Sequence, residues 1–228
     1  MIYFKGCVVR EKLHNISKST EILLNRTNTE YEILKNEKCC GSFLLRTGFV
    51  DDALQIMGET LQDIQGEKIL VSCAGCYNTL KNDYKNILDV KIDVVHTSQF
   101  FCSLVNEGKL SVKKIDKKVT YHDPCHLGRH CGEYEAPRKL LNQVADLVEM
   151  ERNREGSMCC GSGGGFRALN PKLARKIAKI RLNDASEIGA DYLTTTCSFC
   201  NLNLNSVVSG KKKILDISEI MLMGLNDE

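Results

Sequence analysis

The sequence predicts an α/β protein made by internal duplication. Two observations indicate this fold class. Short apolar runs, typical of buried strands, alternate with longer segments typical of helices, and the cysteines occur in two series of nearly equal spacing. Such alternation is typical of parallel sheets covered by helices. We therefore expect two Rossmann-like halves with parallel sheets, related by a pseudo-two-fold axis.

The two cysteine series define the repeat. The first contains Cys7, Cys39, Cys40, Cys73 and Cys76, and the second contains Cys125, Cys159, Cys160, Cys197 and Cys200. Matched positions are 118, 120, 120, 124 and 124 residues apart, and each adjacent pair is followed by glycine. We expect one domain over residues 1–108 and another over 109–228. The polar, lysine-rich stretch Asn106–Lys118 would connect them.

The first half reads as strands and helices in turn. Apolar runs predict strands at Ile2–Phe4, Tyr31–Leu34, Ile69–Val71 and Val94–His96, and the segments between them predict helices at Ser17–Leu24, Asp51–Ile64 and Tyr77–Ile87. In the helix over Asp51–Ile64 the stripe Leu54-Met57-Leu61 is expected to face the core.

The second half repeats this order. Strands are predicted at Val119–His122, Leu147–Met150, Tyr192–Thr195 and Ile214–Ile217, and helices at Pro137–Val144, Pro171–Ser186 and Cys200–Val207. The stripe Leu173-Ile177-Ile180 is expected to be buried. Most of the cysteines follow strand ends, where open α/β sheets place their ligands.

Composition excludes several classes of protein. Of 228 residues, 43% are hydrophobic and 26% charged, which is ordinary for a globular chain, and 31 basic against 29 acidic side chains leave no broad charge for nucleic acid. No signal peptide or run of about 18 apolar residues occurs. We expect a cytoplasmic protein that does not insert into a membrane and meets one, if at all, through a partner subunit.

Twelve cysteines in such a protein indicate metal binding or redox chemistry more than disulfides, except in the cytosol of a hyperthermophile. Thiolates suit zinc and iron–sulfur clusters, and Cys-x-x-Cys presents two sulfurs to one site. Zinc and a cubane cluster each take four ligands, so five per half is one too many. The spacing leaves open a spare thiol or a cluster of unusual shape.

Other candidate residues surround the second series. The glycines Gly161, Gly163, Gly164 and Gly165 could bring backbone N–H groups to a cluster or anion, or could form a flexible turn. His122, His126 and His130 could complete a Cys/His zinc site, tune a cluster or donate protons, or serve turn packing. We favour His126 as a proton donor, and Arg129 and Arg167 as anchors for anionic substrate groups. Cys102 and Cys131 lie outside both series, and Cys102 is expected to be a buried apolar residue.

The whole chain resembles the tandem cysteine-rich CCG-domain family. Three stretches carry the resemblance: CCGSFLLRTG from Cys39, YHDPCHLGRH from Tyr121 and CCGSGGGFR from Cys159. The family includes the CCG-domain subunit of heterodisulfide reductase and the C-terminal half of the single-chain form of that enzyme. It implies two noncubane [4Fe-4S] clusters, each held by the five cysteines of one series. A cubane cluster or zinc in one half is the alternative.

The resemblance also implies a function. A chain that keeps all ten cysteines is expected to split a low-molecular-weight disulfide of the CoM-S-S-CoB type between its two clusters, as a catalytic subunit in methanogenesis. The chain lacks a ferredoxin-type cysteine run, so a ferredoxin-type [4Fe-4S] subunit and a flavoprotein are the expected partners. The alternative is an electron-relay subunit of an FAD-linked 2-hydroxy-acid, glycerol-3-phosphate or thiol:fumarate oxidoreductase.

Overall fold

The computed structural model describes residues 1–208 and 214–225 and contains two parallel sheets. The first has the order β1-β2-β3, formed by Ile2–Phe4, Ile69–Val71 and Val94–His96. All residues of β1 and β2 are buried, as the continuous apolar runs require when helices cover both faces of a parallel sheet. These three strand predictions are confirmed.

The second sheet has the order β5-β4-β6-β7. Its strands are Asp146–Leu147 (β5), Lys118–His122 (β4), Tyr192–Thr195 (β6) and Ile214–Asp216 (β7), and all pairs are parallel. The α/β class with parallel sheets is therefore confirmed.

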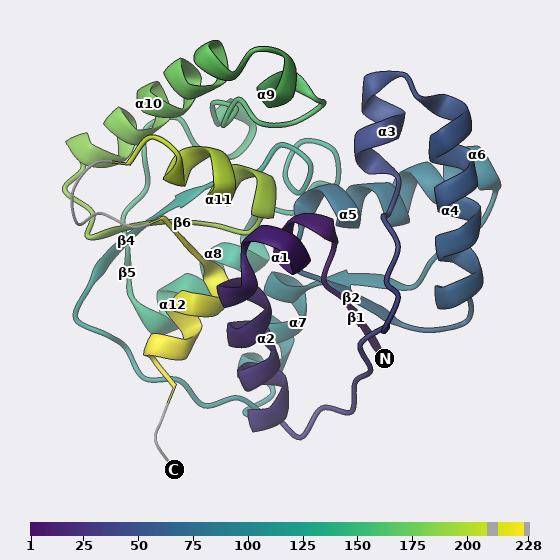
Figure 1. The fold of residues 1–228 in the computed structure, drawn as a ribbon. Coiled ribbons are helices and arrows are strands. Elements are labelled where there is room, and N and C mark those ends of the chain that lie inside the picture. The colour runs from purple at the N-terminus through teal and green to yellow at the C-terminus, as the bar shows by residue number, and fades with distance from the viewer. Residues whose placement is uncertain (209–213, 226–228) are drawn as a thin grey trace.

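Helices follow the strands in both halves (Figure 1). In the first half they are α1 (Cys7–Lys12), α2 (His14–Arg26), α3 (Ser42–Thr47), α4 (Val50–Ile64), α5 (Ala74–Asn78), a π-helical turn (Thr79–Asp83), α6 (Tyr84–Leu88) and α7 (Thr97–Asn106). In the second half they are α8 (Glu135–Val144), a 3-10 turn (Arg154–Gly156), α9 (Phe166–Leu169), α10 (Pro171–Glu187), α11 (Ser198–Asn205) and α12 (Ile217–Met223).

The two halves pack against each other. Helix α12 lies against α2, α7 against α8, and α1 near α11 (Figure 1). Two hydrophobic cores result, and each takes side chains from both halves: Phe4 and Leu204 belong to the first core, and Leu23 and Ile220 to the second.

Several sequence-based boundaries are wrong. Tyr31–Leu34 forms no strand, because only an isolated bridge between Ile2 and Glu32 joins it to the first sheet. The strand predicted at Leu147–Met150 is the two-residue β5, and Ile217 begins α12 instead of extending β7. Apolar composition alone did not indicate that these segments lack partners for longer ladders.

The apolar stripe predicted on α10 is also wrong. Leu173 and Ile180 are 49% and 45% exposed. The buried face consists of three alanines and Arg181, which is fully buried. Small side chains let this helix pack closely against α11, and the polar head of Arg181 is paired. On α4 the centre of the predicted stripe, Met57, is buried, while Leu54 is 36% exposed.

Candidate metal centres

Several of the cysteines lie just after the ends of strands. Cys7 begins α1 just past β1, and the first Cys-x-x-Cys follows β2 with Cys73 at the N-terminal cap of α5. In the second half Cys125 follows β4, and Cys197 caps α11 after β6. Because β1 pairs in parallel with β2 and β4 with β6, these cysteines gather at the carboxyl edges of the sheets.

The glycine of each Cys-Cys-Gly stretch has a physical reason. Gly41 and Gly161 have φ of 86° and 81°, in the left-handed region where a side chain is strained. A Cβ on Gly41 would lie 2.6 Å from Cγ of Met57, and one on Gly161 would lie 3.1 Å from the carbonyl oxygen of Ala174. Glycine therefore lets each cysteine pair pack against the long helix that follows it.

The loop carbonyls of the cysteine pairs are held by polar side chains. Thr60 Oγ1 donates to the Cys39 carbonyl over 2.9 Å, and Asn203 Nδ2 donates to the Cys160 carbonyl over 2.7 Å. The backbone N–H of Gly161 also donates to Sγ of Cys159 over 3.3 Å. These bonds orient the pairs toward the strand-end cysteines of the same half.

Within each half the five thiols interact as one chain of neighbours. In the first half the order is Cys7, Cys39, Cys40, Cys76 and Cys73. In the second it is Cys125, Cys159, Cys160, Cys200 and Cys197. The order of the matched positions is the same in both. Cys197 also interacts with Cys73, so the two chains meet.

The close packing of the thiols lowers the pKa of some and raises the pKa of others. Hydrogen bonds from Cys40 and Cys7 lower the pKa of Cys39 to about 3, and those from Cys125 and Cys160 lower the pKa of Cys159 to about 2. The pKa of Cys7 is raised, first by its hydrogen bond to Cys39 and then by burial. Each half therefore holds thiolate among further sulfur donors, which is the form that soft metal ions bind.

The two sulfur chains share one cavity. Nine of the ten cysteines line it, together with Ser42, Phe43, Arg46, Gly75, Pro124, His126, Gly163, Gly164 and Phe199. The tenth, Cys159, is exposed but bonds to its neighbours. The sequence analysis missed Arg46 and Phe43 as cavity residues, although both lie in the CCGSFLLRTG stretch. Arg46 Nη2 is paired with Asp83 over 2.7 Å.

Of the histidines, His126 lies in the cavity wall. A Cβ on Gly75 would lie 3.6 Å from its Nδ1 and 3.5 Å from Sγ of Cys73. Burial, and then the neighbouring His130, lower the pKa of His126, and the two rings meet edge to face with centroids 5.0 Å apart. His130, which is exposed, therefore connects the half-buried imidazole of His126 to the exterior.

His122 has a different environment. It is 1% exposed, and its ring nitrogen lies with Sγ of Cys160 and Cys200 in a group whose atoms are all within 4.8 Å of one another. Burial, and then the charge of Arg181, lower its pKa to about 3. Its imidazole is therefore neutral.

The remaining candidate residues take varied positions. Arg129 donates to the carbonyls of Glu155 and Ser157, so its guanidinium braces the loop before Cys159. Arg167 lies in α9. A Cβ on Gly165 would lie 2.4 Å from Thr47 Cγ2, so this glycine permits contact with the first half.

The two cysteines outside the series differ from the others. Cys102 is 7% exposed within the second core, as expected for a small apolar residue. Cys131 is half-buried, and its thiol donates to Asn78 Oδ1 over 3.5 Å. Both lie apart from the two sulfur chains.

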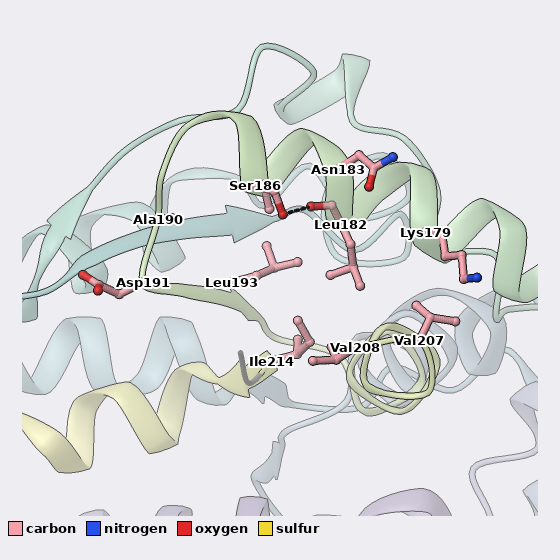
Figure 2. Close-up of a pocket in the computed structure, with 11 residues that line it drawn as sticks. Lys179, Leu182, Asn183, Ser186, Ala190, Asp191, Leu193, Val207, Val208 and Ile214 are labelled. Atoms are coloured by element: carbon pink, nitrogen blue, oxygen red, sulfur yellow. Dashed lines mark hydrogen bonds between the residues drawn. The ribbon is translucent and has the colours of Figure 1, made fainter. Parts of the chain in front are cut away.

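A second pocket, of about 300 Å³, lies between α10, β6 and α11 (Figure 2). Its wall is largely aliphatic, with Leu182, Leu193 and Ile214 pointing inward and Lys179 and Asp191 at its edges. Among the described residues that line it, none is a cysteine or a histidine. It therefore lacks the donors found in the first cavity.

Two parallel sheets that bring sulfur ligands to a common cavity define a metal-binding α/β protein. Comparison with known proteins specifies the class. The family model for the CCG cysteine-rich domain matches residues 1–81 and 119–205, and the chain belongs to this family.

Relatives include iron–sulfur and oxidoreductase subunits. The chain is 37% identical over 235 residues to one subunit of dihydromethanophenazine:CoB–CoM heterodisulfide reductase from Methanosarcina acetivorans, covering 98% of this chain and 58% of the relative. It is 31% identical over 231 residues to one subunit of fumarate reductase (CoM/CoB) from Methanothermobacter marburgensis, covering 99% and 46%. The chain thus spans about half the length of these relatives.

Similarity to solved structures is weak. Glutamate racemase RacE1 from Bacillus anthracis aligns over 98% of this chain and 79% of its own, with a TM-score of 0.41 and 12% identity. Among the described residues, no helix is long and apolar enough to cross a membrane.

The donor set fits iron–sulfur clusters. The ten thiols of the two series bond mainly to one another, and six of them are buried. Buried thiols and thiolates in mutual contact, without matching carboxylates, are the surroundings that iron and sulfide favour over hard cations. Family membership and the iron–sulfur relatives agree with this chemistry.

Proposed function

We propose that the chain is the iron–sulfur catalytic subunit of a heterodisulfide-reductase-like complex, which splits a low-molecular-weight disulfide between two noncubane [4Fe-4S] clusters. One observation carries the proposal: the two five-thiol chains face one cavity and meet at Cys73 and Cys197. A disulfide has two sulfur atoms, so two adjacent centres suit its cleavage better than one.

The ligand sets follow the chains. The first cluster would use Cys7, Cys39, Cys40, Cys73 and Cys76, and the second Cys125, Cys159, Cys160, Cys197 and Cys200. Bound clusters would supply single electrons and a coordination position for sulfur. The reaction consumes one disulfide, two electrons from a partner subunit and two protons, and releases two thiols.

The cavity residues would bind the disulfide and supply a proton. Phe43 and Phe199 provide apolar wall, and Arg46 offers a cation to a carboxylate or phosphate on the substrate. His126 would pass a proton to a departing thiolate, because its ring lies in the wall of the cavity. Proton return through His130 is supported by their ring contact. Arg129 and Arg167 are also proposed to anchor anionic groups of the substrate.

The same arrangement supports the other parts of the proposal. Tyr3 shares a hydrogen bond with the Ser72 hydroxyl over 2.8 Å, and Tyr121 with the Thr196 hydroxyl over 2.7 Å. These matched contacts before each Cys-x-x-Cys favour two Rossmann-like domains, 1–108 and 109–228, with pseudo-two-fold symmetry. A ferredoxin-type subunit and a flavoprotein would deliver the electrons, because the relatives are subunits of larger oxidoreductases.

An electron-relay function in a flavin-linked enzyme is the second candidate. It is favoured by a 30% identical relative, the EtfAB:quinone oxidoreductase of Syntrophomonas wolfei, of which the chain covers 34%. In a relay, the cavity would be a path between clusters and would bind no disulfide.

The deciding experiment uses anaerobically purified protein supplied with a low-potential electron donor. It is mixed with a heterodisulfide, while thiol release and paramagnetic signals are followed. The reductase proposal expects two thiols per disulfide and a new signal that broadens when the iron is enriched in its magnetic isotope. Cluster reduction by a 2-hydroxy acid plus a flavoprotein, without any response to disulfide, would support the relay and overturn the reductase.

A further inference from the structure

The ring of His122 has one satisfied nitrogen and one that lacks a partner. Its Nδ1 receives a hydrogen bond from Nε of Arg181 over 3.1 Å, whereas its buried Nε2 has no hydrogen-bond partner within the described structure. An unpaired buried N–H costs free energy, so the absence of a partner calls for an explanation.

Arg181 determines which ring nitrogen carries the proton. A guanidinium has five N–H donors and no acceptor, so the nitrogen that faces it must accept. With Nδ1 accepting, a neutral imidazole must hold its proton on Nε2. A nitrogen that carries a proton has no lone pair for iron or zinc. The contact with Arg181 therefore excludes His122 as a neutral metal ligand, despite its position beside two cysteines.

The guanidinium itself is firmly held. It donates to the Arg152 carbonyl over 2.8 Å, to Asp184 over 3.0 Å and to the Ser157 hydroxyl over 3.4 Å. These contacts on a fully buried side chain leave it little freedom to turn away from His122. The ring orientation is thus imposed by Arg181.

The first half shows that the fold does not need this polar pair. Phe4 matches His122 at the spacing that separates Cys7 from Cys125. The glycine contacts match Ala53 of α4 with Ala174 of α10, so Thr60 matches Arg181. Phe4 and Thr60 are both buried. An uncharged pair fills the same places, so packing alone explains neither the imidazole nor the buried charge.

We infer that His122 donates its Nε2–H to a sulfur of the second cluster and, as a positioning residue that is not a ligand, raises the reduction potential of that cluster. The candidates are the sulfurs of Cys160 and Cys200, which form with a ring nitrogen of His122 a group whose atoms lie within 4.8 Å of one another. Hydrogen bonds to cluster sulfurs favour the reduced state, because they offset its added negative charge. The inference rests on the proposed iron–sulfur function.

The first experiment is a potentiometric titration of the anaerobic protein. Replacing His122→Phe gives this place the phenyl ring of the first half, and Arg181→Leu in the same variant leaves no orphan guanidinium. One cluster should then become reducible only at lower potential, while the other keeps its potential. His122→Gln keeps an N–H donor and should shift the potential less. The exposed His14→Gln is the matched control and should change nothing.

The second experiment reads the hydrogen bond directly. Protein with ¹⁵N-labelled histidine is poised so that the second cluster is paramagnetic, and pulsed EPR is recorded in H₂O and D₂O. We expect an exchangeable proton coupling that disappears in His122→Phe/Arg181→Leu and weakens in His122→Gln, with only weak nitrogen coupling. Strong coupling to a directly bound ¹⁵N that the His122 substitutions abolish would overturn the inference.

Iron analysis separates this inference from the proposed function. Protein without iron would overturn both. Two bound clusters with no disulfide cleavage would end the reductase proposal but leave His122 testable. If both clusters are bound and the His122 substitutions leave their reduction potentials unchanged, the inference alone is overturned. Loss of only the second cluster's iron in His122→Gln would also overturn it, since that result would make the imidazole a ligand.

Discussion

The thiols of Cys73 and Cys197 interact, although the two residues belong to different repeats. Each is the first cysteine of its Cys-x-x-Cys and caps the helix that follows. This contact lowers the pKa of Cys73 well below the ordinary value and makes Cys73 the anion at the junction between the halves. The junction leads to the first prediction.

Cys73→Ser is expected to alter both clusters, whereas Cys7→Ser should alter only the first. Cys7 bonds within its own half, through Cys39. Contacting groups couple energetically, and distant ones act nearly additively. Mössbauer spectra of the two variants provide the measurement. Confinement of the Cys73→Ser change to one cluster would show that the sulfur contact is not kept in the loaded protein.

Iron content should be about eight per chain, four in each half. Cys40→Ser and Cys160→Ser should each remove about four irons and leave the other cluster in place. Cys131→Ser is the matched control, because this thiol bonds to Asn78 outside the two chains. Metal analysis after anaerobic purification measures the outcome. Two zincs with negligible iron would contradict the assignment.

Gly161→Ala should destabilise the protein by roughly 1–3 kcal/mol, because its φ is positive and a Cβ would meet the backbone of α10. The second cluster should also be lost more easily. Gly163→Ala is the control within the same loop, since a Cβ there meets nothing within 4 Å. Urea unfolding of both variants gives the comparison. Equal stability of the two would show that the loop rearranges freely.

Stability should also depend on the protonation of His96. Burial lowers the pKa of this side chain to about 4, although Cys73 and Glu133 oppose the shift. In the unfolded chain His96 takes up a proton near pH 6.5, whereas in the folded protein it does so only near pH 4. Folding stability from this group is therefore present above pH ~6.5 and is lost as the pH falls toward 4, by up to about 3 kcal/mol.

His96→Asn should flatten this part of the stability profile, because asparagine can still cap α7 without titrating. The difference between wild type and variant isolates His96 from other groups such as Asp216, whose raised pKa acts in the opposite direction. Urea unfolding across the acidic to neutral range is the measurement, with His14→Asn as control. Parallel profiles for wild type and His96→Asn would refute the linkage.

The sequence predicted the strands that carry cysteines because their apolar runs are short and end in recognisable ligands. It failed at Tyr31–Leu34, which has strand-like composition but pairs only through Glu32. Whether a segment finds a full ladder depends on neighbours far away in the chain, and composition does not report them.

The site was predictable to the same extent. Cysteine spacing indicated two sulfur-rich centres, yet it could not show that Cys73 meets Cys197 or that Arg181 lies buried behind His122. A basic residue in an amphipathic helix normally indicates an exposed face. Only the contacts of Arg181 with the end of β4 and with the loop that contains Arg152 and Ser157 reverse that expectation.

The mixed composition of the two cores bears on how the duplicated gene product can evolve. Phe4 shares a core with Leu204, and Leu23 shares one with Ile220. Cutting the chain between the repeats would bare apolar surface on each piece, as separating the subunits of an obligate dimer does. One repeat can therefore lose its ligands and diversify in chemistry, but it must remain as the scaffold of the other.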